Sequence, residues 1–243
     1  MRWIYISPHF DDAILSCGGL IFEQTRAGIP VEIWTVCAGI PPTQQPLSDL
    51  ARRIHIKWGT RTARGTIILR RREDKTAGAA VGASIRFFNH IDCIYRRGQD
   101  GAPLYTDDVF VSPHAEDAGI PDMLANLFKR ALKRDDVIVC PLSVGHHVDH
   151  VLTRLGVERV GRSLLYYADT PYVLNHPHEL EIMSKGMAGT LYPITEMGMD
   201  AWHAGMTAYQ SQLETLNVGA TEVRAAVREY WLREKGIRLY KPA

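Results

Sequence analysis

Short hydrophobic runs alternate with longer amphipathic stretches along most of the chain. The short runs are rich in β-branched and aromatic residues, which favours strands, at Trp3–Ser7, Val31–Cys37, Ile85–Asn89, Val137–Pro141 and Leu164–Ala168. Elsewhere apolar residues recur with helical spacing, which predicts helices at Ala13–Ala27, Leu47–Lys57, Arg71–Val81, Pro121–Lys133, Val151–Val160, Ala201–Leu216 and Thr221–Arg233. Residues Ile91–His114 are rich in Gly, Pro and Asp, and we expect an irregular surface loop there.

This order of elements predicts the α/β fold class. We expect a single Rossmann-like, doubly wound domain over residues 1–243, with a mostly parallel sheet and helices on both faces. In sheets of this kind, ligands bind beyond the carboxyl ends of the strands. The residues that follow Ser7 and Pro141 are therefore where chemistry is expected.

Composition and charge narrow the function classes. The formal net charge is +1, which gives no domain-wide basic excess for nucleic acid, and no segment is long and apolar enough to predict a membrane span. The first residues turn polar too early for a secretory signal, so a cytoplasmic protein is expected. Four cysteines lie far apart in apolar surroundings and are expected to be buried free thiols: Cys17, Cys37, Cys93 and Cys140. The arginines at 70–72 are followed by two acids, and a solvated helix start is expected there.

The segment that follows the first strand reads SPHFDD, at residues 7–12. His9 and Asp12 are three residues apart in a turn, so both can face one cation, while Asp11 points elsewhere and can face a substrate. Either aspartate could instead cap the helix that follows. The imidazole of His9 in the same turn weighs against capping alone.

A second cluster, HHVDH at residues 146–150, follows the strand that ends at Pro141. Two such clusters after parallel strands are expected to meet at one edge of the sheet. His9, Asp12 and His150 would give a cation two nitrogens and one oxygen and leave room for water, as in catalytic zinc sites. Asp11 is then the candidate general base, and His147, oriented by Asp149, a candidate stabiliser of the oxyanion.

These two motifs resemble those of the LmbE-like, or PIG-L, de-N-acetylase family. SPHFDDAILSCGG resembles the first family motif and HVDH the second, and RREDKTAGAAVG, DCIYRRG, YADTPY and AYQSQ extend the resemblance over the chain. The resemblance implies a zinc ion held by His9, Asp12 and His150, with Asp11 as base and His147 backed by Asp149. Phe10 and Ala13 stand where Pro and Glu are commoner, and this variant resembles a branch found with sugar and glycosylated natural-product metabolism.

The expected substrate is an N-acylated amino sugar or a glycoside, and not a peptide. Aromatic and hydrogen-bonding residues near the strand ends are the candidate substrate contacts: Arg71, Tyr95, Arg96, Asp169 and Tyr172. The loop Ile91–His114 is long enough to form a rim that selects what enters. His176 and His178 are expected at the surface, and the pair Gly18–Gly19 lacks the spacing of a nucleotide-binding loop. The oligomeric state is not predicted.

Three other functions fit parts of the pattern. Two histidines and a carboxylate also suit a non-haem iron oxygenase, although the α/β alternation weighs against that class. Paired aspartates suit a metal phosphoesterase, but there are too few carboxylates for a two-metal site. A non-catalytic sugar-binding protein on the same fold is the third, and the presence of every expected catalytic residue weighs against it.

Overall fold

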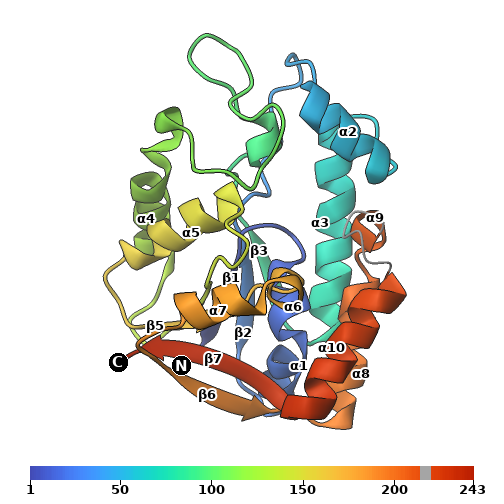
Figure 1. Cartoon of the computed structure of the whole chain (residues 1–243), viewed down its shortest axis with the longest axis vertical. Coiled ribbons are helices and arrows are strands. Elements are labelled where there is room, and N and C mark those ends of the chain that lie inside the picture. The colour runs from blue at the N-terminus through green and yellow to red at the C-terminus, as the bar shows by residue number, and fades with distance from the viewer. Residues whose placement is uncertain (214–219) are drawn as a thin grey trace.

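A computed structural model describes residues 1–213 and 220–243. Seven strands form one sheet in the order β3-β2-β1-β4-β5-β7-β6 (Figure 1). The strands are β1 Trp3–Ser7, β2 Val31–Thr35, β3 Ser84–Phe87, β4 Val137–Pro141, β5 Leu164–Tyr167, β6 Met187–Pro193 and β7 Gly236–Pro242. The first five in chain order pair in parallel, while β7 pairs antiparallel with both β5 and β6. The mostly parallel α/β sheet expected from the sequence is confirmed.

The strand order reverses between β1 and β4. From β1 the chain adds β2 and then β3 on one side, and from β4 it adds β5 on the other. At such a switch point the connections leave the two carboxyl ends in opposite directions and open a crevice. Ser7 and Pro141 end the two strands that border this crevice.

Helices cover both faces of the sheet (Figure 1). One face carries α1, α3, α8 and α10, and the other carries α4 and α5. The helices are α1 Asp12–Arg26, α2 Asp49–Lys57, α3 Ala63–Ala80, α4 Ile120–Ala131, α5 Val148–Glu158, α6 Tyr172–Asn175, α7 Pro177–Met183, α8 Glu196–Thr207, α9 Gln210–Leu213 and α10 Ala220–Glu234, with short 3-10 turns η1 Cys93–Tyr95 and η2 Ala115–Asp117.

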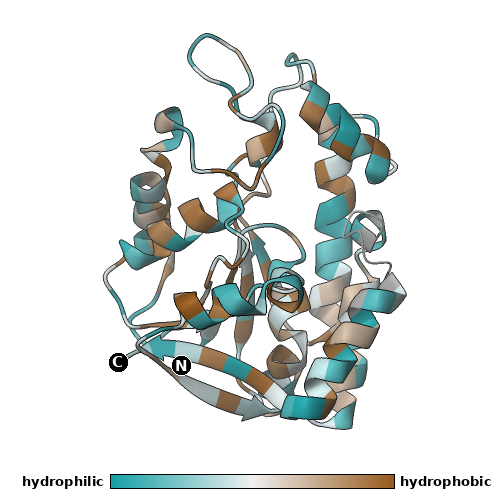
Figure 2. Ribbon diagram, in the orientation of Figure 1, coloured by the Kyte–Doolittle hydropathy of each residue, from teal (hydrophilic) through white to brown (hydrophobic). Residues whose placement is uncertain are grey.

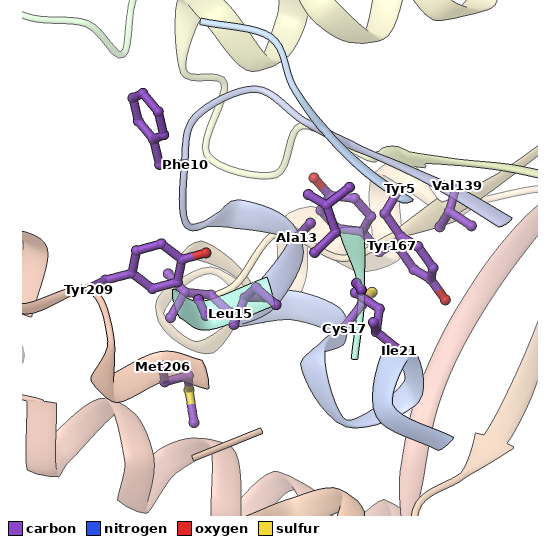
Figure 3. Packing of buried hydrophobic residues seen from close by; sticks show 14 of the residues in the cluster. Tyr5, Phe10, Ala13, Leu15, Cys17, Ile21, Val139, Tyr167, Met206 and Tyr209 are labelled. Carbon is purple, nitrogen blue, oxygen red and sulfur yellow. The ribbon is translucent and has the colours of Figure 1, made fainter. Parts of the chain in front are cut away.

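Alternate residues of β1 enter two separate cores, because successive side chains of a strand point to opposite faces. Ile4 and Ile6 pack in the cluster that contains Phe128 of α4. Tyr5 packs in the other cluster, beside Cys17 of α1 (Figure 3). The central strands are accordingly hydrophobic along most of their length, whereas the outer helices are mixed (Figure 2). This double burial fixes β1 and so fixes the turn that follows it.

Helix α3 differs from its prediction at its start. It begins at Ala63, where the Thr62 side chain accepts a hydrogen bond from the backbone N–H of Gly65, two turns before the predicted start at Arg71. Arg70 therefore lies inside the helix and is buried. The expectation of a solvated helix start at 70–72 was wrong for this residue.

The C-terminal region differs most from the prediction. Strands β6 and β7 were missed; most of β6 is exposed, so its residues do not alternate between apolar and polar. The helix predicted at Ala201–Leu216 is α8 followed by the short α9, and its last positions lie outside the described residues. The helix predicted at Thr221–Arg233 is confirmed as α10.

Two further sequence features have structural explanations. The four cysteines are buried free thiols, as expected. Gly18 allows close packing of α1 against α8, since a Cβ at this position would lie 2.5 Å from Cδ1 of Trp202. None of the helices in the described ranges has the length and apolar character needed to cross a membrane.

Candidate metal centre

The first turn of the site is closed by its own side chains. The Ser7 hydroxyl donates to the backbone oxygen of His9 (2.6 Å) and accepts from the N–H of Ala13 (3.1 Å). Asp12 Oδ2 accepts from the backbone N–H of His9 (2.7 Å). Asp11 occupies the cap position of α1 but makes no capping hydrogen bond, so its carboxylate is free for another role.

The second turn links β4 to α5 through backbone of left-handed conformation. Ser143, Gly145 and His146 have φ values of 64°, 83° and 57°. A Cβ at Gly145 would also lie 3.0 Å from Cγ of Tyr172, so this position requires glycine. Side chains from outside the turn hold it, since Asp169 accepts from the N–H of Val144 (3.1 Å) and Glu179 accepts from the N–H of Gly145 (2.9 Å).

The two turns meet at the carboxyl ends of β1 and β4, as the sequence predicts. Asp12 Oδ2 lies 3.5 Å from Nδ1 of His9 and 3.3 Å from Nε2 of His150. His9, His147 and His150 each offer a ring nitrogen within 4.8 Å of the others. His9, Asp11 and His147 stay 7 to 8% exposed, so the cluster reaches solvent at one side.

Buried carboxylates engage one nitrogen of each proposed ligand histidine. Nδ1 of His150 lies 2.8 Å from Asp169 Oδ1, while its Nε2 is buried and has no hydrogen-bond partner among the described residues. Nε2 of His9 lies 3.2 Å from Asp149 Oδ2, which leaves Nδ1 to face Asp12. Metal-binding histidines are commonly oriented in this way by a hydrogen bond at the second nitrogen. The residues present therefore fit a metal ion between His9, Asp12 and His150.

The electrostatics of this cluster also favour a cation. Burial lowers the pKa of His150, but the negative charges of Asp12 and Asp169 outweigh burial and raise the pKa to about 9. For His9 too, burial lowers the pKa while hydrogen bonds to Asp12 and Asp149 raise it well above its usual value. Burial raises the pKa of Asp12, yet the two imidazoles bring it well below its usual range. A metal ion would take the place of the protons on these two rings.

Asp11 lies beside a buried arginine that sequence reasoning did not single out. Arg70 Nη2 is 3.5 Å from Asp11 Oδ1, and its guanidinium lies over the rings of Phe10 (4.9 Å) and Trp58 (4.6 Å). Burial raises the pKa of Asp11, and the charge of Arg70 opposes part of that rise. Arg70 shares a helix face with Ile67, Asp74 and Ala77, which was the available signal for its burial.

Asp149 has different partners from those expected. Its carboxylate contacts the Arg96 guanidinium, the N–H of Cys93 (2.9 Å) and His9, so it backs His9. Its link to His147 is its backbone N–H, which donates to Nδ1 of His147 (3.2 Å). A neutral His147 therefore carries its proton on Nε2. Burial lowers the pKa of His147, and the charges of His9 and His150 lower it further.

Three of the expected substrate contacts have polar atoms that are engaged by other protein groups. Tyr95 is buried, with its hydroxyl 2.7 Å from Nε2 of His55, a histidine for which the sequence suggested no partner. Arg96 is buried between the carboxylates of Asp149 and Asp117. Asp169 is 1% exposed, and its two oxygens are engaged by His150 and Val144. Asp169 supports His150, while Tyr95 and Arg96 are each 8% exposed, as His147 is, so their contact with substrate stays a prediction.

The other two expected contacts lie nearer the surface. Arg71 donates to the backbone oxygen of Ala38 (2.6 Å) and to Oδ1 of Asn89 (3.2 Å). The ring of Tyr172 lies 5.6 Å from that of His150 and 5.6 Å from that of Phe110. Phe110 had not been singled out, because it lies in an irregular loop where the sequence gives no periodic signal.

Comparisons with known proteins agree on a family. Residues 4–160 match the family described as PIG-L, GlcNAc-PI de-N-acetylase. A 2'-N-acetylparomamine deacetylase of Niallia circulans is 30% identical over 245 residues, covering 94% of this chain and 79% of the relative. A protein of the same description from Streptomyces fradiae is 27% identical over 181 residues, covering 70% of this chain and 57% of the relative. The zinc-inhibited form of teicoplanin deacetylase has the same fold, with a TM-score of 0.82, 22% identity, and coverage of 100% of this chain and 97% of that one.

Proposed function

The chain belongs to the PIG-L, or GlcNAc-PI de-N-acetylase, family and is an enzyme of the deacetylase class, and we propose that it hydrolyses the N-acetyl group of an amino sugar with the help of zinc. One observation carries the proposal. A buried imidazole nitrogen of His150, without a hydrogen-bond partner in the part of the chain that the structure describes, faces the carboxylate of Asp12, and His9 completes the set.

His9, Asp12 and His150 would hold the metal, His9 through Nδ1 and His150 through Nε2. Two nitrogens and one carboxylate oxygen are a common ligand set of catalytic zinc. When bound, the zinc supplies Lewis-acid chemistry, since it polarises the amide carbonyl and lowers the pKa of a water molecule. A zinc-inhibited form of a protein with the same fold supports zinc as the metal to test first.

Asp11 would act as the general base. Its carboxylate makes no cap and is buried beside the proposed ligand Asp12, within reach of Arg70. It would accept a proton from the attacking water and later pass that proton to the nitrogen of the departing amine. Arg70 would hold the carboxylate in place and favour its ionised form.

His147 would stabilise the oxyanion. The N–H of Asp149 occupies its Nδ1, so Nε2–H is available to donate to the carbonyl oxygen as negative charge develops there. Because the pKa of His147 is lowered, a neutral donor is expected near pH 7. A donor that is fixed before the reaction needs no reorganisation during it.

The substrate class rests on the relatives. Two of them are described as deacetylases of 2'-N-acetylparomamine, and one structural neighbour as a teicoplanin deacetylase. We therefore infer that this chain acts on an N-acetylated amino sugar, free or within a larger glycoside. A peptide amide is not the expected substrate.

The test is acetate release from a matched panel of amides. N-acetylglucosamine, N-acetylglucosaminides and N-acetylated aminoglycosides would be compared with N-acetyl amino acids, before and after chelation and with zinc or iron(II) restored. Acetate release from the sugars, lost on chelation and restored by zinc, is expected. Faster release from the amino acids would refute the substrate class, and restoration by iron alone would refute the zinc assignment.

A further inference from the structure

Two aromatic side chains lie directly against the histidines of the site. The ring of Phe110 is 5.4 Å from that of His147, and the ring of Tyr172 is 5.6 Å from that of His150. The two aromatic rings are 5.6 Å apart, and the two imidazoles are 5.2 Å apart. The four rings thus form a closed set of contacts, which ties the position of Phe110 to that of the proposed oxyanion donor.

The backbone around Phe110 is held in place although the loop is irregular. Asp108 Oδ1 accepts hydrogen bonds from the N–H groups of Val109 (2.7 Å) and Phe110 (3.1 Å). The backbone oxygen of Val109 accepts from the N–H of Val148 (2.9 Å), the first residue of α5. The loop is therefore fastened to the helix that carries His150, and Phe110 is presented at a defined position.

Phe110 and its neighbour Val111 remain 46% and 42% exposed, next to a cluster of buried polar groups. Adjacent exposed apolar residues beside a cluster of polar groups are typical of ligand-binding surfaces. We propose that Phe110, supported by Tyr172, contacts the sugar ring of the substrate and selects for substrates that carry one. This inference rests on the proposed deacetylase function and specifies which part of the substrate the loop recognises.

The sugar is the part that fits this position. The amide carbon must lie at the metal, with the acyl group on one side and the amino sugar on the other. An acetyl group has a single methyl beyond the carbonyl, so it offers an aromatic ring little apolar area to cover. A sugar ring is larger, reaches toward solvent, and has an apolar face of C–H groups that an aromatic ring can cover.

Substitution of Phe110 separates contact with the sugar from contact with the acyl group. Kinetics would be measured for wild type, Phe110→Leu and Phe110→Ala with a methyl N-acetylglucosaminide, with N-acetylethanolamine, which lacks the ring, and with an N-hexanoyl glucosaminide. The ratio of kcat/KM for the glucosaminide to that for N-acetylethanolamine is expected to fall about tenfold in both variants, mostly through KM. Leucine keeps apolar area without an aromatic face, so it should not rescue the ratio.

Two further variants serve as controls. Met123→Ala removes a side chain of α4 that is 41% exposed and should leave the ratio at its wild-type value. Asp108→Ala releases the two N–H groups that position Phe110 and should lower the ratio in the same direction as Phe110→Ala. Because Phe110 is half-exposed, the variants are expected to fold, and equal thermal midpoints would verify it.

The outcomes distinguish this inference from the proposed function. Acetate release with an unchanged ratio in both Phe110 variants would overturn the inference and leave the function standing. A changed preference for hexanoyl over acetyl, with an unchanged dependence on the sugar, would assign the loop to the acyl group and also overturn it. If wild type released no acetate but bound methyl glucosaminide in calorimetry with about tenfold weaker binding in Phe110→Ala, the function would fail and the sugar contact would stand.

Discussion

The two turns that carry the site are built in opposite ways. The turn after β1 is closed from within, because Ser7 and Asp12 accept hydrogen bonds from its own backbone. The turn after β4 contains left-handed backbone at Ser143 and His146 and is held from outside by Asp169. The first turn is closed mainly by its own side chains, with one further bond from the N–H of Cys37 to Pro8 O (2.8 Å), whereas the second is held by side chains that follow it in the chain. Metal binding is therefore expected to tolerate distant changes on the β1 side better than on the β5 side.

The carboxylates that orient the two proposed ligand histidines also differ from each other, in the groups that they contact. His9 is backed by Asp149, which comes from the opposite turn and is paired with the buried Arg96. His150 is backed by Asp169, which follows β5 and accepts from a backbone N–H and from His150. Burial raises the pKa of Asp149, but Arg96 and His9 bring it well below its usual range. Burial dominates at Asp169 and raises its pKa. One carboxylate is thus fixed as an anion by a cation, and the other depends on His150.

The largest expected effect comes from breaking the first turn at its two aspartates. Asp12→Asn should lower zinc affinity by at least about a hundredfold, because an anionic ligand becomes neutral. Asp11→Asn should keep the metal and lower kcat by about 10²- to 10⁴-fold, because a base is lost. Metal content by mass spectrometry and acetate release would be measured on both. The two isosteric variants are adjacent, so each controls for the other, and equal loss of metal in both would refute the division of roles.

A smaller effect is expected from the two orienting carboxylates, and it sharpens the comparison. Asp149→Asn removes the negative partner of a buried guanidinium and should cost about 3 kcal/mol of unfolding free energy. Asp169→Asn keeps an oxygen for His150 but gives up an acceptor for the N–H of Val144, and should cost about 1 kcal/mol. Each should weaken zinc binding by about 10- to 100-fold.

Denaturant unfolding of the metal-free proteins would measure the two costs. Arg96 also pairs with buried Asp117, so the matched control combines Asp149→Asn, Arg96→Met and Asp117→Asn, which leaves none of the three charges unpaired. It should be more stable than Asp149→Asn alone. If Asp149→Asn and Asp169→Asn lost the same unfolding free energy, the pairing of Asp149 with Arg96 would not make the two carboxylates different in stability.

The sequence predicts the features that depend on local patterns, and it does not predict those that depend on contacts between distant segments. The proposed ligands His9, Asp12 and His150 follow two hydrophobic strands that the sequence predicts, and parallel strand ends meet at one edge of the sheet. Which carboxylate backs which histidine was not predictable, because it depends on how Asp149 reaches across to the opposite turn. Strands β6 and β7 were also missed. Most of β6 lies at the surface, so its sequence lacks the hydrophobic run that marks the central strands, and β7 is its antiparallel partner.

A third buried carboxyl extends the comparison to a group that accepts hydrogen bonds from neutral hydroxyls. Asp74 of α3 is fully buried, accepts from the hydroxyls of Thr35 (2.6 Å) and Tyr209 (2.7 Å), and joins α3 to the segment that follows α8. Burial raises its pKa to about 8, although the two hydroxyls oppose the rise. Between its ordinary pKa near 4 and about pH 8, the folded state therefore holds a proton that the unfolded state has released.

The last expected effect concerns the pH dependence of stability, and it follows from the direction in which the pKa of Asp74 is shifted. When the native state binds more protons than the unfolded state, stability falls as pH rises, so this carboxyl destabilises the fold progressively from about pH 4 to about pH 8. Asp74→Asn removes the titration while keeping a polar group that both hydroxyls can contact. It should gain about 1.4 kcal/mol of unfolding free energy over wild type for each pH unit between pH 5 and pH 8. Asp49→Asn on α2 removes the same charge from the surface and should leave that slope unchanged. If the unfolding free energies of wild type and Asp74→Asn depended on pH in the same way, Asp74 would be ionised in the folded state. Its protonation state would then be the same as that of Asp149.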